Sequence, residues 1–313
     1  MKTLIIGAGG MIGRKLTAAL RGEDLILHDV VPFEGASAVS DLSTPGEAEK
    51  LLASRPQLIF HLAAVVSGEA EADFEKGYRV NLDGTRLLFE AIRKANYKPR
   101  LVFTSSIAVF GAPFPDAIGD EFLNAPLTSY GTQKAIGELL LSDYSRRGLF
   151  DGIGIRLPTI CVRPGKPNKA ASGFFSGIIR EPLSGQEAVL PVPETVRHWF
   201  ASPRAAVGFL LHAARMKTEQ LGNRRNLSMP GISATVGEQI AALRRVAGDK
   251  VASLIRREPD ATIMRIVEGW PRNFEARRAL ELGFRADRSF EEIIRIHIED
   301  ELQKSPQPRP GRA

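Results

Sequence analysis

Short apolar runs alternate with amphipathic helical patterns along the first half of the chain, and this alternation limits the possible folds more than any other feature. A strand that is buried on both faces of a parallel sheet reads as a continuous apolar run, and the helices between such strands carry the chain back across the sheet. We therefore predict an α/β protein whose parallel sheet is covered by helices on both faces. The apolar runs lie at 3–7, 24–29, 57–64, 100–106 and 152–158, and the helical patterns at 11–20, 78–95 and 129–145.

The second half of the chain changes in texture from about residue 165. Proline, glycine and short polar turns become frequent, as is typical of loops that cover a binding cleft. Helical patterns return at 204–215 and 235–246, so we expect a smaller C-terminal α+β domain above that cleft. The expected boundaries are 1–165 for the first domain, with 197–229 returning to it, 166–196 and 230–303 for the second domain, and 304–313 for a flexible tail.

Composition and charge exclude several classes of function. The 42 Lys and Arg residues outnumber the 36 Asp and Glu residues, but they are scattered, and this does not favour a nucleic-acid-binding protein. No apolar stretch is long enough to span a bilayer, and the five histidines lack the spacing of metal ligands. The single cysteine, Cys161, excludes an internal disulfide framework. We expect a cytoplasmic protein that binds no nucleic acid, membrane or metal.

A glycine-rich turn follows the first apolar run. Gly7, Gly10 and Gly13 lie between this run and the next helical pattern, where glycine lets the backbone approach a pyrophosphate and the helix N-terminus offers free amide donors. About 20 residues further on, Asp29 ends the second run, where its carboxylate can accept hydrogen bonds from ribose hydroxyls and would repel a 2′-phosphate. These features predict a Rossmann-type, doubly wound sheet that binds NAD rather than NADP. A turn with only a packing role is the alternative.

Tyr130 is the only one of four tyrosines with a lysine, Lys134, four residues later. On a helix this spacing puts both side chains on one face, and a nearby ammonium lowers the pKa of a phenol, which can then act as a general base. The run at 100–106 ends in Ser105 and Ser106, whose hydroxyls could hold an alcohol while the nicotinamide accepts a hydride. Such a pair alone is more often a solvated helix face, but behind a glycine-rich loop it favours alcohol oxidation.

These motifs, in this order, resemble the extended short-chain dehydrogenase/reductase family, the group that contains sugar-nucleotide epimerases and dehydratases. The resemblance covers nearly the whole length and is carried by "GAGGMIG", "HLAA", "VNLDGT", "SSIAVFG" and "SYGTQK". It implies that Ser106, Tyr130 and Lys134 are catalytic, that the smaller domain binds the substrate, and that the protein is a homodimer. It also implies a set of NAD-binding residues: Gly7, Gly10, Met11, Ile12, Gly13, Asp29, Asp41, Leu42, Leu62, Ala63, Ala64, Asn81, Tyr130 and Lys134.

Departures from the family pattern bear on the substrate. Phe110 replaces the usual tyrosine, Thr159 replaces an asparagine in "RLPT", and "FASPRAAV" replaces paired aspartates after Arg197, which argues against a nucleotide sugar. The segments 156–185 and 196–210 resemble the branch of D-erythronate dehydrogenases, which oxidise a four-carbon sugar acid with NAD. A desolvated carboxylate needs a cation, and the candidates are Arg163, Lys166 and Arg197.

We therefore predict NAD-dependent oxidation of a small sugar acid, D-erythronate to 2-dehydro-D-erythronate, with Ser106, Tyr130, Arg163 and Arg197 contacting the substrate. One alternative is a nucleoside-diphosphate-sugar epimerase similar to UDP-glucose 4-epimerase, which would use the same residues and release no NADH. Another is a non-catalytic NAD-sensing protein, whose function would survive the loss of the Tyr130 hydroxyl.

Overall fold

The centre of the fold is a seven-stranded parallel sheet, which the computed structural model describes within residues 1–165 and 171–303. Its strand order is β11-β7-β5-β4-β1-β2-β3. The order reverses direction beside β1, which is the doubly wound arrangement predicted from the sequence. The strands are β1 (Lys2–Ile6), β2 (Asp24–Asp29), β3 (Ala38–Val39), β4 (Leu58–His61), β5 (Arg100–Ser106), β7 (Asp151–Leu157) and β11 (Asn226–Ser228).

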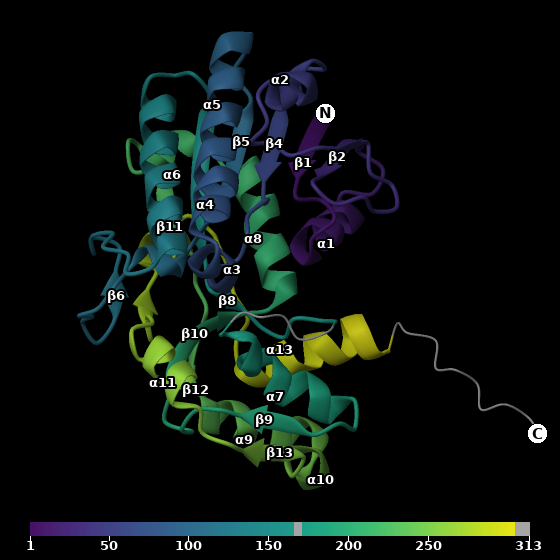
Figure 1. Ribbon diagram of the computed structural model, residues 1–313, viewed down its shortest axis with the longest axis vertical. Coiled ribbons are helices and arrows are strands. Elements are labelled where there is room, and N and C mark those ends of the chain that lie inside the picture. Colours follow the sequence, from purple (N-terminus) through teal and green to yellow (C-terminus); the bar gives the residue numbers. More distant parts are fainter. Residues whose placement is uncertain (166–170, 304–313) are drawn as a thin grey trace, which may run out of the picture.

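Helices cover both faces of this sheet, because alternate side chains of each strand point to opposite faces. Leu4 and Ile6 of β1 pack in the core under α2, α5 and α6, whereas Ile5 packs in the core under α1 and α8. Figure 1 shows α5 and α6 together over one face of the sheet. These helices are α1 (Met11–Ala19), α2 (Glu47–Leu52), α5 (Gly84–Ala95), α6 (Ser129–Arg146) and α8 (Pro203–Arg215).

The chain before α5 departs from the single helix predicted over 78–95. Two short helices, α3 (Ser67–Ala72) and α4 (Phe74–Gly77), lead into a π-helical turn at Tyr78–Asp83, and α5 begins only at Gly84. π-Helical turns are rare and are often found beside functional sites. This turn contains Asn81, whose side chain points into the protein.

A smaller domain lies below the carboxyl ends of the large sheet in Figure 1. Its three-stranded sheet has the order β12-β10-β8, and helices α7, α9 and α13 pack around a separate apolar core. The strands and helices of this part are β8 (Thr159–Ile160), β9 (Ala188–Leu190), β10 (Arg197–Ala201), β12 (Ile232–Thr235), β13 (Ile255–Arg257), α7 (Gly173–Leu183), α9 (Val236–Ala247), α10 (Asp249–Ala252), α11 (Ala261–Glu268) and α13 (Phe290–His297). In addition, β6 (Ile118–Gly119) pairs with β14 (Phe274–Glu275), and α12 (Arg277–Glu281) packs near β11.

The return to the first domain begins one strand later than the sequence suggested. We expected residues 197–229 to return together, but β10 pairs with β8 and β12 in the smaller sheet, and only α8 and β11 rejoin the large one. The chain therefore crosses between the domains at Ser202, the N-cap of α8, whose hydroxyl accepts from the Ala205 amide at 3.0 Å. The tail predicted at 304–313 lies outside the described residues.

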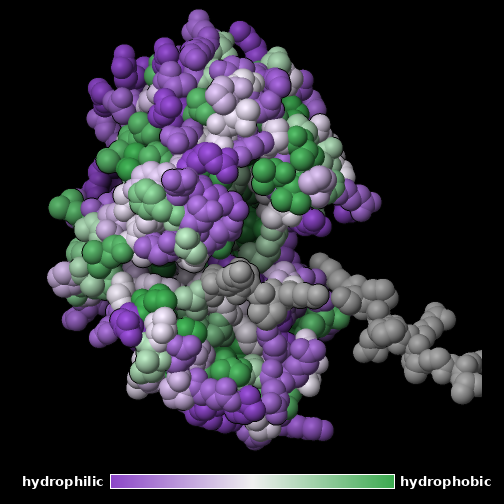
Figure 2. Space-filling model, in the orientation of Figure 1, coloured by the Kyte–Doolittle hydropathy of each residue, from purple (hydrophilic) through white to green (hydrophobic). Residues whose placement is uncertain are grey.

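Hydrophilic residues predominate at the two ends of the face in Figure 2. Large exposed apolar side chains are scattered rather than gathered on one helix, as on most globular proteins. Among residues 1–165 and 171–303, every helix is too short or too polar to cross a membrane.

Candidate active site

A cleft of about 500 Å³ lies at the carboxyl ends of β1, β4, β5 and β7, where the smaller domain faces the large sheet. Ligands of doubly wound proteins bind at this edge of the sheet, beside the strand where the order reverses. The cleft unites most of the residues singled out from the sequence. Those that line it are Gly7, Gly10, Met11, Ile12, Gly13, Leu62, Ala64, Ser106, Tyr130, Lys134 and Arg163.

The glycine-rich loop has the geometry of a phosphate cradle. Gly7 has φ +91°, and a Cβ there would lie 2.7 Å from the Ala63 amide nitrogen. A Cβ on Gly13 would overlap the carbonyl oxygen of Gly7, so α1 packs against the loop only because residue 13 is glycine. No side chain caps the N-terminus of α1, which leaves its first amides free to donate to an anion. The residues present thus fit the pyrophosphate of a dinucleotide.

Asp29 helps to shape this loop. Its Oδ2 accepts from the Gly9 amide at 2.9 Å, and its Oδ1 accepts from the Val31 amide at 3.2 Å. Asp41 forms an ion pair with Arg79, and neither Asp29 nor Asp41 lies on the wall of the cleft. Leu42 is buried in the core under α2 and α5. The expected contacts of these residues with an adenosine stay predictions.

Helix α6 presents Tyr130 and Lys134 to the cleft, as their spacing predicts. The helix begins beside them because the hydroxyl of Thr128, its N-cap, accepts from the Gly131 amide at 3.1 Å. The Ser106 side chain is hydrogen-bonded to the Tyr130 phenol. Lys134 is only 3% exposed, donates to the Thr104 carbonyl oxygen at 2.9 Å, and has its Nζ 5.8 Å from the centre of the Tyr130 ring. The three predicted catalytic side chains are therefore adjacent.

The electrostatics of this group differ from our expectation. Burial raises the pKa of Tyr130, and the Arg163 guanidinium and the Ser106 hydrogen bond oppose that rise without cancelling it. Burial also lowers the pKa of Lys134 to about 8, against the attraction of Glu138. The pKa of Tyr130 is therefore raised rather than lowered as we expected, because desolvation outweighs the charges that oppose it, and the cation that acts on the phenol is Arg163.

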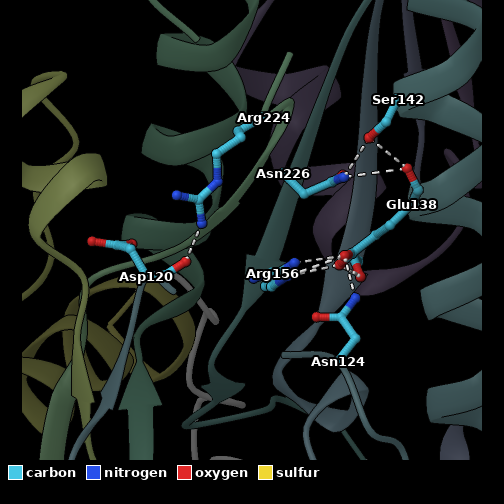
Figure 3. Close-up of polar contacts among 8 residues, drawn as sticks. Asp120, Asn124, Glu138, Ser142, Arg156, Arg224 and Asn226 are labelled. Atoms are coloured by element: carbon cyan, nitrogen blue, oxygen red, sulfur yellow. Dashed lines mark hydrogen bonds and ion pairs between the residues drawn. The ribbon is translucent and has the colours of Figure 1, made fainter. Parts of the chain in front are cut away.

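Sequence reasoning missed a buried carboxylate that lies next to the predicted catalytic residues. Glu138, one helical turn after Lys134, accepts from both Arg156 nitrogens that face it, at 2.8 and 2.9 Å, and from the Ser105 hydroxyl at 2.6 Å. Figure 3 shows Arg156 and Asn124 directed at this carboxylate, with Asn226 and Ser142 bonded around the same turn of α6. Ser105 and Ser106 both contribute to the cleft wall, but the Ser105 hydroxyl donates its proton to Glu138.

Asn81 supports the site without reaching the cleft. It is 2% exposed, accepts from the Val65 amide at 2.9 Å and donates to the Val65 carbonyl oxygen and to Gln133 Oε1, at 3.1 and 2.8 Å. Every polar atom of its amide is engaged within the protein, so its assignment as a cofactor contact needs correction. Asn81 instead fixes the loop after β4 against α6. Gln133, which sequence reasoning passed over, is a buried residue of α6.

The three cations considered for a substrate carboxylate differ in their position relative to the cleft. Arg163 lines the cleft, burial lowers its pKa, and among the described residues no carboxylate pairs with its guanidinium. Arg197 pairs with Glu238 at 3.2 Å and donates to Ser233, away from the cleft, so its assignment to the substrate was wrong. Its strand is in the smaller sheet and turns the side chain toward the N-terminus of α9. Lys166 lies outside the described residues.

Within residues 1–165 and 171–303, no three His, Cys, Asp or Glu side chains come together as ligands could. Cys161 is fully buried, and burial raises the pKa of its thiol to about 12. A thiol in such surroundings is inert.

The fold, the glycine cradle and the Ser106, Tyr130 and Lys134 group agree with a comparison of whole sequences. The chain belongs to the NAD dependent epimerase/dehydratase family, whose sequence profile matches residues 3–223. It is thus an enzyme of the extended short-chain dehydrogenase/reductase type.

Three similar proteins narrow the comparison. A D-erythronate dehydrogenase of Cupriavidus necator is 49% identical over 96% of this chain and 98% of its own length. A D-erythronate dehydrogenase of Haemophilus influenzae is 42% identical over 96% of this chain and 100% of its own. A crystal structure described as the nucleoside-diphosphate-sugar epimerase from Agrobacterium tumefaciens is 68% identical, has a TM-score of 0.93, and covers 97% of this chain and 95% of that one.

Proposed function

We propose that this protein oxidises D-erythronate to 2-dehydro-D-erythronate with NAD. Two relatives of that activity match it over nearly their whole length. The observation that carries the proposal is the desolvated Arg163 guanidinium, which has no carboxylate partner among residues 1–165 and 171–303 and lies in the same cleft as Tyr130 and Lys134. A buried guanidinium gains a bidentate, charge-assisted partner when a carboxylate binds. An acid that carries a hydroxyl beside its carboxylate supplies both the anion and the group to be oxidised.

Each catalytic side chain has a separate task in this proposal. The Ser106 hydroxyl donates to the substrate oxygen at C2 and keeps it beside the Tyr130 phenol, its own hydrogen-bond partner. Tyr130 removes the proton from that oxygen as the general base. Lys134 and Arg163 are the cations that favour the phenolate over the phenol. Bound NAD would accept the hydride from the same carbon. Gly7, Gly10 and Gly13 would hold its pyrophosphate at the start of α1, with Asp29 near the ribose.

The test is the formation of NADH, followed by absorbance, with NAD and a panel of aldonic acids of three to six carbons. We expect D-erythronate to be the best substrate. Tyr130→Phe should abolish turnover and leave NAD affinity, measured by calorimetry, unchanged within about twofold. Turnover by none of the acids would refute the proposal. Full function in Tyr130→Phe would instead support a non-catalytic NAD sensor.

Arg163 gives a sharper test of the substrate class. In Arg163→Leu we expect KM for D-erythronate to rise about 10- to 100-fold, as for a lost charge-assisted hydrogen bond. Because Arg163 opposes the rise in the pKa of Tyr130, the pH at which kcat/KM increases should also move upward. Arg197→Leu, which removes a cation outside the cleft, is the matched control and should change neither quantity. Equal effects of both substitutions would contradict the assignment.

A nucleoside-diphosphate-sugar epimerase is the second candidate, favoured by the name of the 68% identical structure. An epimerase would return the hydride to the opposite face of the sugar and accumulate no NADH. Incubation with UDP-glucose and with UDP-galactose, analysed for interconversion, separates the two functions. Interconversion without NADH, together with no oxidation of any aldonate, would favour this candidate.

We also propose that the protein is a homodimer, as its family resemblance implies. Leu139, 69% exposed on α6, is an apolar side chain that such an interface could cover. Light scattering at micromolar concentration gives the molar mass directly. A monomer mass near 34.2 kDa would refute the dimer.

A further inference from the structure

A short hydrogen-bonded chain crosses the wall of the cleft where the smaller domain begins. The Thr159 hydroxyl lies 2.7 Å from His198 Nε2, and the other ring nitrogen, Nδ1, lies 2.8 Å from the Pro271 carbonyl oxygen. All three residues line the cleft, and His198 is 3% exposed. By its resemblance to the family, the sequence has Thr159 where an asparagine is usual.

The Pro271 carbonyl oxygen, at one end of these hydrogen bonds, determines where the protons lie. The Pro271 carbonyl oxygen can only accept, so Nδ1 of His198 carries a proton and donates it. Burial among aromatic rings lowers the pKa of His198 to about 4, and the ring is neutral at physiological pH. Nε2 therefore has a lone pair and no proton. Thr159 must donate its single hydroxyl proton to it.

Neighbouring rings prevent His198 from turning to a different arrangement. Phe175 stacks on the imidazole with ring centres 5.2 Å apart and planes inclined by 2°, and Phe200 meets it edge-on at 5.4 Å. Trp270, also on the cleft wall, lies 5.4 Å away. A rotated imidazole would lose both hydrogen bonds and this packing.

Toward a ligand in the cleft, the Thr159 hydroxyl can act only as a hydrogen-bond acceptor. With its proton committed to His198, the Thr159 oxygen offers lone pairs only, so it accepts a hydrogen bond from a hydroxyl and repels a carboxylate or carbonyl oxygen. Arg163, on the same wall, offers donors only. The two residues therefore bind different groups of a ligand. An asparagine at position 159 could have donated and accepted, which would suit more kinds of ligand.

We propose that Thr159, oriented by His198, selects substrates with a second hydroxyl group besides the one that is oxidised. This inference rests on the proposed function and adds that the enzyme distinguishes polyhydroxy acids from simple 2-hydroxy acids. A site built to accept from a substrate hydroxyl discriminates strongly against an analogue without it, because its acceptor is then left unpaired. Thr159 contacts the substrate in this scheme, and His198 is a positioning residue.

The kinetic test compares D-erythronate with its 3-deoxy and 4-deoxy analogues. We expect the wild-type protein to prefer D-erythronate over at least one analogue by about 10-fold or more in kcat/KM. Thr159→Val should reduce that ratio to near one, Thr159→Ser should keep it, and His198→Leu, which frees the hydroxyl to rotate, should reduce it as well. A Thr159→Val variant that loses rate equally with all three acids would overturn the inference while the proposed function stands.

Two further measurements separate the inference from the proposed function. Calorimetry of the same acids with NADH-loaded protein reports hydroxyl-dependent binding even if no acid is oxidised. Such binding, lost in Thr159→Val, would support the inference, and the absence of any binding would overturn it. Nitrogen-15 NMR of the histidine rings, assigned with His198→Leu, should show a neutral ring with its proton on Nδ1. A proton on Nε2 at pH 7 would overturn the inference without any substrate.

Discussion

Replacement of the buried Glu138 by glutamine should lower the unfolding free energy, whereas the same replacement at an exposed carboxylate of α6 should not. The Glu138 side chain is 2% exposed and that of its partner Arg156 is 12% exposed. Glutamine keeps the shape but loses the charge, and its amide nitrogen would meet donors from Arg156, Ser105 or Asn124. The guanidinium would then stay buried without a counterion. Removing one partner of such a pair costs about 3–5 kcal/mol of unfolding free energy.

Urea unfolding followed by circular dichroism measures this loss. At a slope of about 3 kcal/mol per M, the midpoint should fall by roughly 1 to 1.7 M. Asp143→Asn is the matched control, because Asp143 pairs with Arg146 on the exposed face of the same helix. That substitution should change the unfolding free energy by no more than about 0.5 kcal/mol. The double variant Glu138→Leu with Arg156→Met removes both charges and should recover much of the loss.

The same substitution has a second effect that simple destabilisation would not produce. Glu138 opposes the fall in the pKa of Lys134, which lies one turn away on α6. Without this carboxylate the pKa of Lys134 should fall further below about 8, and the pH profile of turnover should shift with it. If Glu138→Gln were no less stable than Asp143→Asn, the view of Glu138 as the anchor behind the catalytic residues would be refuted.

Three other outcomes follow from the site. Burial lowers the pKa of Lys134 from 10.5 to about 8, so the unfolded chain binds more protons at this group between these values, and the contribution of Lys134 to stability rises with pH across that window. Lys134→Met lacks this contribution. In urea unfolding from pH 8 to 10.5, the unfolding free energy of the wild type should increase by up to about 3 kcal/mol relative to that of the variant. A difference that stays constant with pH would contradict the burial of the ammonium. Gly13→Ala should weaken NAD binding at least about tenfold in calorimetry, because its Cβ would overlap the loop, whereas Gly208→Ala on α8, with open space around it, should leave binding intact. Asp29→Ala removes the carboxylate beside the loop and leaves the Arg14 guanidinium nearby, 5.9 Å from the Phe33 ring. Because a 2′-phosphate is then no longer repelled, the ratio of kcat/KM for NADP over NAD should rise at least about tenfold. An unchanged ratio would exclude a role of Asp29 in cofactor choice.

The local patterns that were decisive in the sequence are those whose geometry repeats over a few residues. Five apolar runs became strands, β2 and β5 with the predicted bounds and β1, β4 and β7 with bounds shifted by one to three residues, because a buried strand needs continuous apolar side chains. The Tyr130–Lys134 spacing placed both side chains on one face of α6 for the same kind of reason. The return of the chain at β10 was misplaced, since a strand carries no mark of the sheet with which it pairs.

Local periodicity and the glycine-rich turn thus determined a doubly wound sheet from the sequence alone, and the Tyr130–Lys134 spacing with the strand-end serine predicted which three side chains are catalytic. Only the tertiary structure decided what surrounds them. Arg163 approaches Tyr130, Glu138 gathers partners from β5 and β7, and Arg197 turns away to Glu238. The pKa of a buried group depends on desolvation and on charges that are distant in sequence, and those quantities exist only after the chain has folded.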